Sequence, residues 1–312
     1  MLQLRLITPR NRTDLILREL VAEGGAISVV VHRGAAVKPE GDDVIVADVT
    51  RTAVNALLAR LHQLDIEEHG ELSVIEIDAA RSDAAKRALS AAPGRSEDIL
   101  VWDVLDERLH REGVPSLAFY CFMAVAALIA TVGIVIDSSV LIVGAMVVGP
   151  EYGPLAALAV GIYRRRPGQV RSALGVVVSG LALAVVTATI LTFVFELLDT
   201  GIVEPQTRFF TGFVTQPNAY SAIVAFAAGL VGVMAMGLGR SGALTGVVVS
   251  ATTIPAAAAI GVSAAEGAWH EARGGVIQLV VNVLCLTLGS LAALLVYQAV
   301  WTRIDELPAG PS

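Results

Sequence analysis

Apolar residues form long unbroken runs in the second half of the chain and short alternating runs in the first half. A helix that crosses a bilayer needs about 20 mostly apolar residues, and six runs after residue 115 reach that length. We therefore expect six membrane-spanning helices, at residues 117–136, 139–162, 171–195, 219–238, 243–264 and 276–300. Together they form an α-helical polytopic membrane domain over residues 117–301.

Residues 1–79 predict a small α+β domain. Strand patterns, mostly alternating apolar and polar positions, occur at residues 2–8, 26–32, 43–49 and 71–77. Between them we place a helix from Thr13, as its capping residue, to Glu23, and a second helix over residues 51–68, where leucines recur at helical spacing. The order β-α-β-β-α-β is that of a ferredoxin-like domain, which we place in the cytoplasm.

Residues 80–116 link the two domains. A short helix is expected at Asp83–Ser90 and an amphipathic helix from its cap, Ser96, to Gly113. This segment is either a plain connector, a helix lying on the membrane surface, or a carrier of a conformational signal between the domains. Residues 302–312 form a short tail.

Arginines near the ends of the spans predict the orientation. With the N-terminus inside, eight arginines flank the inner ends and two, Arg208 and Arg273, the outer ends; the eight are Arg108, Arg111, Arg164, Arg165, Arg166, Arg171, Arg240 and Arg303. The first residues lack the apolar core of a signal peptide. We therefore expect both termini in the cytoplasm and the protein in the inner membrane of a bacterium.

The second span is unusual in its small residues, its prolines and its carboxylate. Small residues recur every fourth position, at Ala145, Gly149, Gly153, Ala157 and Gly161, a stripe that lets backbones approach closely in lipid. Pro150 and Pro154 leave the carbonyls of Met146 and Pro150 without helical donors. Glu151 lies between the prolines, and carboxylates inside a membrane usually face a polar interior. Tight packing with a simple kink is the alternative explanation of the glycines and prolines.

The fifth span repeats part of this pattern. Its small residues are Gly242, Gly246 and Ser250, and Pro255 frees the carbonyl of Ala251. Because each half has three spans, the second half enters the membrane from the opposite side, which predicts a 3+3 inverted repeat. In such proteins the interrupted spans meet at the midplane and form the binding site. The expected site residues are Glu151, Tyr152, Pro150, Pro154, Ser250, Thr252, Thr253 and Pro255, joined by Gln278 and Asn282 of span six.

Composition and charge exclude other classes of function. The chain is 55% hydrophobic, and its net charge of −7 argues against nucleic acid as a partner. The two cysteines, Cys121 and Cys285, both lie in apolar spans and imply neither a disulfide framework nor a zinc site. Motifs of the types HExxH and GxSxG are absent from the sequence, as are carboxylate pairs spaced for catalysis. We expect no enzyme activity and no cofactor or metal.

Four stretches of the membrane half carry a resemblance to a known family. They are Ala130-Thr131-Val132-Gly133 to Ser138-Ser139, Val143-Gly144-Ala145-Met146 through Gly153-Pro154, Gly246-Val247-Val248-Val249 through Ile254-Pro255, and Val280-Val281-Asn282. With these stretches the chain resembles the DUF389 family of hydrophobic bacterial membrane proteins, which brings no assigned reaction. The second stretch of the family usually reads GAM-x-x-(S/A)-P-L-M-G-P, and its fifth span ends in two prolines. Here Glu151 and Tyr152 follow Pro150, which implies that coupling of a proton or cation through Glu151 is peculiar to this branch.

Two hypotheses of function follow. The first is a transporter or channel for a small solute or ion, with its site between spans two and five and a cytoplasmic domain for regulation or assembly. The alternative is a membrane-anchored ligand sensor or oligomeric scaffold without transport. The small-residue stripes also predict a homo-oligomer.

Overall fold

A computed structural model describes residues 1–22, 26–77, 100–198, 208–216, 218–239, 246–247 and 253–305, without the side chains of Glu67 and of residues 301–305. The chain divides into two compact units, Met1–Leu105 and Asp106–Ser312. The linker helix predicted at 83–90 and its neighbour's cap, Ser96, lie outside the described residues. The second linker helix is α5 (Trp102–Glu112).

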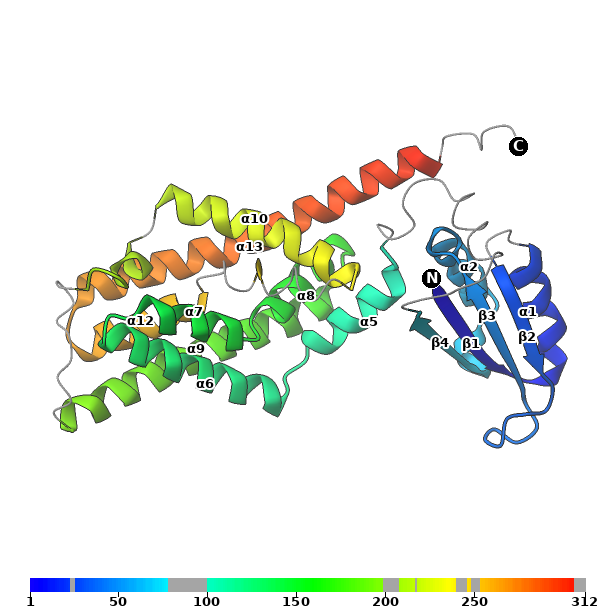
Figure 1. Ribbon diagram of the computed structural model, residues 1–312, viewed down its shortest axis with the longest axis horizontal. Helices are drawn as coiled ribbons and strands as arrows, with labels where there is room; N and C mark the ends of the chain where they lie inside the picture. Colours follow the sequence, from blue (N-terminus) through cyan, green and yellow to red (C-terminus); the bar gives the residue numbers. More distant parts are fainter. Residues whose placement is uncertain are drawn as a thin grey trace. The chain divides into compact units, whose positions relative to one another are not determined.

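The N-terminal unit is built on a four-stranded antiparallel sheet (Figure 1). Its strands lie in the order β2-β3-β1-β4, the order of the split βαβ arrangement. In chain order the elements are β1 (Leu2–Thr8), α1 (Arg10–Ala22), β2 (Ala26–His32), β3 (Asp43–Val49), α2 (Arg51–Gln63), α3 (Ile66–His69) and β4 (Glu71–Glu76). The predicted strands agree with these bounds to within one residue.

One face of the sheet packs against α1 and α2. Alternation puts every second side chain of β1 on this face, and the fully buried core contains Leu2, Leu4, Leu6, Ile16, Leu20, Leu57, Leu58 and Leu61. The second helix is shorter than predicted, because α2 ends at Gln63 and Asp65 adopts a left-handed backbone with φ +50° before the separate helix α3.

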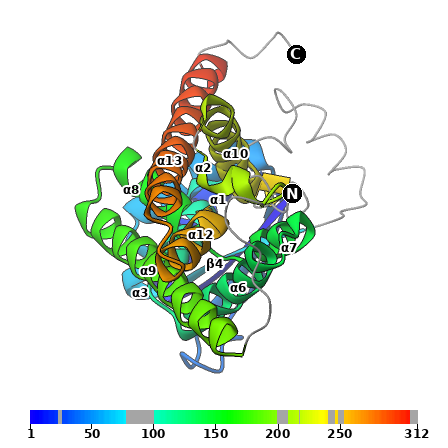
Figure 2. The same ribbon diagram turned by 90° about the vertical axis from the view of Figure 1, so that its left-hand side faces the viewer.

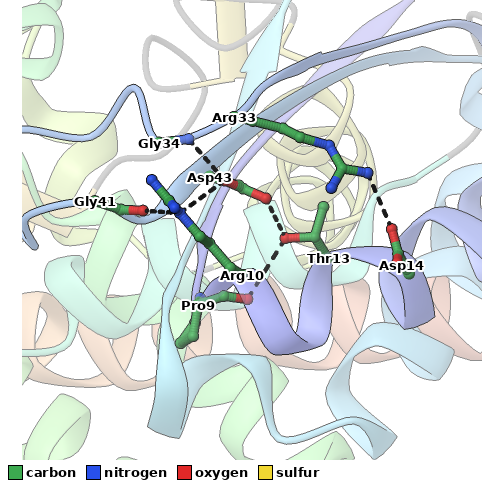
Figure 3. A network of polar contacts seen from close by, with 8 residues as sticks. All are labelled: Pro9, Arg10, Thr13, Asp14, Arg33, Gly34, Gly41 and Asp43. Atoms are coloured by element: carbon green, nitrogen blue, oxygen red, sulfur yellow. Dashed lines mark hydrogen bonds and ion pairs between the residues drawn. The ribbon is translucent and has the colours of Figure 1, made fainter.

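The first helix also differs from the prediction, because it begins at Arg10 and not at Thr13. Thr13 lies inside the helix, and its hydroxyl donates to Asp43 Oδ2 at 2.7 Å in place of capping (Figure 3). The other carboxylate oxygen of Asp43 accepts the Gly34 N–H at 2.7 Å, with Arg10 Nε 4.0 Å away. The Gly34 bond, followed by the Thr13 bond, holds the pKa of Asp43 below its ordinary value.

The second unit contains the apolar helices. These are α6 (Leu117–Val135), α7 (Ser139–Val148), α8 (Tyr152–Tyr163), α9 (Pro167–Leu197), α10 (Ala219–Gly237), α12 (Thr253–Ala265) and α13 (Trp269–Asp305), with the short 3₁₀ helix η3 (Gly212–Thr215) before α10. Of the described helices, α6, α9, α10 and α13 are long and apolar enough to cross a membrane, and α7 with α8 makes a fifth span if the bent pair is counted as one. The first half of the predicted fifth span lies almost entirely outside the described residues, and α12 covers its second half.

Helix α12 lies at the centre of this unit, between α9, α13 and α6 (Figure 2). Close packing around it depends on glycines, since a Cβ at Gly261 would overlap the backbone of α9 at Val185. Two further glycines, Gly229 of α10 and Gly289 of α13, let the backbones of those helices meet in the same way. Large apolar side chains such as Val178, Ile190 and Leu288 remain more than half exposed on the outside, as expected for a surface that faces lipid.

Candidate functional site

The second predicted span is broken at residues 149–151. Helices α7 and α8 meet there at an angle of 54°. Pro150 has no N–H to offer the carbonyl of Met146, and α7 ends at Val148. Pro154 is the third residue of α8, a position whose N–H has no partner within the helix. The expectation that the Pro150 carbonyl loses a helical donor is therefore wrong, because Pro150 precedes the new helix.

Glu151 is buried at this break. Its residue is 2% exposed, and its Oε1 accepts a hydrogen bond of 2.8 Å from the hydroxyl of Thr253, the first residue of α12. Oε2 has no hydrogen-bond partner among the described residues. A Cβ at Gly149 would overlap both this carboxylate and the side chain of Ile254. Glycine at 149 thus leaves the space that the carboxylate occupies, and an unpaired buried carboxylate oxygen is costly unless something else satisfies it.

The two helices that begin at the site share one local design. Helix α8 begins Tyr152-Gly-Pro154, and α12 begins Thr253-Ile-Pro255, so each has proline as its third residue. Proline suits the first turn, where its missing N–H costs no intrahelical bond. Through the contact of Glu151 with Thr253, the residue that precedes α8 lies beside the first described turn of α12. Two of the expected site residues, Ser250 and Thr252, lie outside the described residues, as does Ala251.

Helix α13 adds two buried amides. Gln278 and Asn282 are 1% and 0% exposed, and Gln278 Nε2 donates to Asn282 Oδ1 at 3.2 Å. Gly275 packs against Ile260 and Ala256 of α12. Because consecutive helices joined by a short turn run in opposite directions, Gln278 lies about one turn further along, toward the N-terminal half of α12. Gln278 Oε1, like Glu151 Oε2, is a buried oxygen without a hydrogen-bond partner among the described residues.

Tyr152, expected as a site residue, packs against α10. It is 3% exposed, and its hydroxyl donates to the carbonyl of Gly229 at 3.4 Å. Ser290 of α13 donates to the same carbonyl at 3.0 Å. A Cβ at Gly232 would overlap the tyrosine ring. The hydroxyl of Tyr152 therefore serves a contact between helices.

The small-residue stripe of the second span is covered by the same chain. A Cβ at Gly153 would overlap the carboxylate of Glu112, and one at Gly161 would press on Val170 of α9. Gly246 has no neighbour within 4 Å of the place a Cβ would take, and Gly242 lies outside the described residues. The stripe on α7 and α8 thus packs within one chain, and a homo-oligomer stays a prediction without support from it.

The sequence analysis missed one carboxylate near the break. Glu112 ends α5, and its carboxylate lies against Gly153 in the first turn of α8. Partial burial raises the pKa of the Glu112 carboxyl, although the charges of Arg108 and Arg111 act in the opposite direction. In the sequence Glu112 is one of many charged residues of an amphipathic linker helix, and nothing there indicates contact with the membrane unit.

A second set of polar contacts joins the elements at the opposite end of the membrane unit. Asp137, in the turn between α6 and α7, accepts hydrogen bonds from the N–H groups of Phe210 and Thr211. Arg208, just before them, forms an almost fully buried ion pair with Glu266, which follows α12. The segment 208–216 therefore holds the α6–α7 turn to the α12–α13 turn.

The described residues contain no group of three or more His, Cys, Asp or Glu that could hold a metal ion. Long apolar helices around a buried carboxylate, in a chain that also contains a small α+β unit, indicate a helical membrane protein. The family model described as "Domain of unknown function (DUF389)" matches residues 146–288, from the break to α13. The membrane unit is therefore similar to the DUF389 family, as its motifs indicate. No curated protein and no solved structure was found to match it.

Proposed function

We propose that the membrane unit is a transporter or channel for a small solute or ion, with its site at Glu151, Thr253 and the neighbouring amides of α13. The observation that carries the proposal is the contact between Glu151 and Thr253, which joins a broken span to the first described residue of the apolar helix α12. Interrupted helices that meet in this way are typical of binding sites in secondary transporters.

The directions of the two short helices support an inverted repeat of three and three spans. Helix α8 runs from the site to the arginine-rich turn 164–166, where α9 begins. Helix α12 runs from the site to Glu266, which pairs with Arg208 beyond the far end of α9. The two helices therefore leave the site in opposite directions. In this plan α12 is the second half of the predicted fifth span, 243–264.

Access to the site requires movement, because Glu151, Thr253 and Asn282 are all buried. On the arginine-rich side, α5 is the element that obstructs access to the site. Arg108 donates to the last-turn carbonyl of Met236 at 2.7 Å, and Asp106 pairs with Arg164 at 3.3 Å. Because α5 continues directly from the N-terminal unit, we assign that unit a regulatory role through α5. Eight arginines flank the inner ends of the predicted spans and two flank the outer ends, which supports placing this side of the membrane unit in the cytoplasm.

The test is ion flux into vesicles that contain the full chain. We would measure proton entry with a trapped pH dye, and Na⁺ and K⁺ entry with isotopes, under an imposed membrane potential. Glu151→Gln keeps the size of the side chain but removes the charge, and we expect at least a tenfold loss of flux. Glu196→Gln, an exposed carboxylate at the end of α9, is the matched control and should behave as wild type.

Two results would contradict the proposal. Wild-type vesicles that pass none of the three cations faster than empty vesicles would favour the alternative, a sensor or scaffold whose membrane unit does not transport. Flux through Glu151→Gln with the rate and pH dependence of wild type would remove the carboxylate from the mechanism.

A further inference from the structure

A cavity of about 600 Å³ lies between the end of α8 and the beginning of α9. It is on the arginine-rich side of the membrane unit, away from Glu151. Its volume lies within the range of sites for small organic ligands. The lining residues are Gly161, Ile162, Arg165, Arg166, Pro167, Val170, Arg171 and Leu174.

Two of the three arginines in this cavity are available to an anion. Asp106 is shared between Arg164 and Arg166, at 3.3 and 3.4 Å. Arg165 and Arg171 are exposed and form no ion pair with any residue that the structure describes. The carboxylate of Asp106 therefore faces Arg164 and Arg166, whereas the positive charges of Arg165 and Arg171 are left uncompensated inside the cavity. A guanidinium group matches two oxygens of a phosphate through parallel hydrogen bonds.

The remaining wall of the cavity is apolar and faces outward. Ile162 and Leu174 are 42% and 46% exposed. Arg171, Leu174 and Val178 are spaced by three and four residues, so they follow one another along a single face of α9. Val178 is 58% exposed on that face. The cavity thus opens onto the surface that faces the hydrocarbon of the bilayer.

We propose that this cavity binds one anionic phospholipid of the inner leaflet. Arg165 and Arg171 bind the phosphate, and an acyl chain follows Leu174 and Val178 along α9. A soluble phosphate would use the arginines but would leave the apolar wall uncovered, which favours lipid as the occupant. Basic pockets between membrane helices on the cytoplasmic side suit anionic lipid head groups for the same reason. This inference does not depend on transport by the protein.

The test is lipid retention by the full chain in detergent, measured by native mass spectrometry. Phosphatidylglycerol and phosphatidylcholine with identical chains are added at matched concentrations. We expect the wild type to retain phosphatidylglycerol preferentially, in a ratio of one lipid per chain. Arg171→Gln should weaken this binding about tenfold, the loss expected for one charge-assisted pair. Arg273→Gln, an exposed arginine at the start of α13, changes the net charge equally and should have no effect.

Three outcomes would overturn the proposal. One is equal retention of the two lipids by wild type, and another is equal loss of binding in the Arg171 and Arg273 variants. The third is protection of the cavity by inorganic phosphate, read as slower hydrogen exchange at residues 165–171, without protection by phosphatidylglycerol. Thermal unfolding of each variant in lipid-free detergent checks that a loss of binding is not a loss of folding.

Discussion

Asp137 accepts hydrogen bonds from both the N–H and the hydroxyl of Thr211, at 2.9 and 2.8 Å, although 74 positions separate them in the chain. Asp137 has φ +53°, a left-handed conformation that aspartate tolerates better than most residues. Burial raises the pKa of Asp137, but the bonds from Thr211, Phe210 and Phe209 together outweigh it, so the pKa lies below its ordinary value. This carboxylate holds the segment 208–216 to the rest of the membrane unit.

Asp137→Asn should destabilise the membrane unit by about 1.5–3 kcal/mol near neutral pH, because it removes hydrogen bonds to a charged group. Since the folded pKa is lowered, the contribution of Asp137 is complete above the unfolded pKa of about 3.9. It is lost as the pH falls through the folded value. Thermal unfolding in detergent at pH 7 and pH 3 measures both effects. Thr211→Ser keeps the hydroxyl and should remain near wild type, and equal stability of wild type and Asp137→Asn at pH 7 would contradict the prediction.

Arg208→Gln should destabilise the membrane unit more than Asp137→Asn does, by about 3–5 kcal/mol, because it leaves the buried carboxylate of Glu266 without its partner. Burial raises the pKa of Glu266, while Arg208 lowers it. Protonation favours the folded state of a group whose folded pKa is raised, so stability is gained as the pH falls through that pKa. The variant should therefore be less impaired at pH 5 than at pH 8. The double variant Arg208→Gln with Glu266→Gln should recover much of the loss, and its failure to do so would argue against this pair.

Gly232→Ala should destabilise the contact between α8 and α10 by about 1–3 kcal/mol, the usual cost of overpacking. The added methyl group would overlap the ring of Tyr152. Gly175 of α9 is the matched control, because a Cβ there meets no atom within 4 Å. Gly175→Ala should be neutral or slightly stabilising, since alanine favours a helix more than glycine does. Thermal unfolding in detergent compares the two, and an equal effect would show that the overlap with Tyr152 does not matter.

Asp43→Asn should loosen the loop between β2 and β3. The variant loses the charge that accepts the Gly34 N–H and the Thr13 hydroxyl. Hydrogen exchange at residues 26–49 of the full chain should be faster at pH 7 than in wild type. Because the pKa of Asp43 is lowered, the difference should vanish as the pH falls through the folded value. Asp42→Asn, the neighbouring carboxylate, is the control, and equal exchange in the two variants would speak against the network.

Glu151 shows how far sequence reasoning reaches in the candidate site. A carboxylate between two prolines in an apolar run is visible in the sequence, and so is Thr253 beside Pro255. Their hydrogen bond follows only from the packing of α12 beside the break. Tyr152 looked equally promising, yet its hydroxyl bonds the backbone of α10, a partner 77 positions away. Glu112 was missed because its contact with Gly153 leaves no local pattern.

By itself the sequence determined the strands and the apolar helices, the break at Gly149-Pro150-Glu151 and the resemblance to the DUF389 family. These depend on properties of neighbouring residues, such as alternation, length and the missing N–H of proline. Only the tertiary structure decided that the glycine stripe packs within the same chain. It also decided that Asp137 and Arg208 hold the segment 208–216 in place, and which arginines beside α9 remain available to an anion. Such contacts join residues tens of positions apart, and the packing of whole helices determines them.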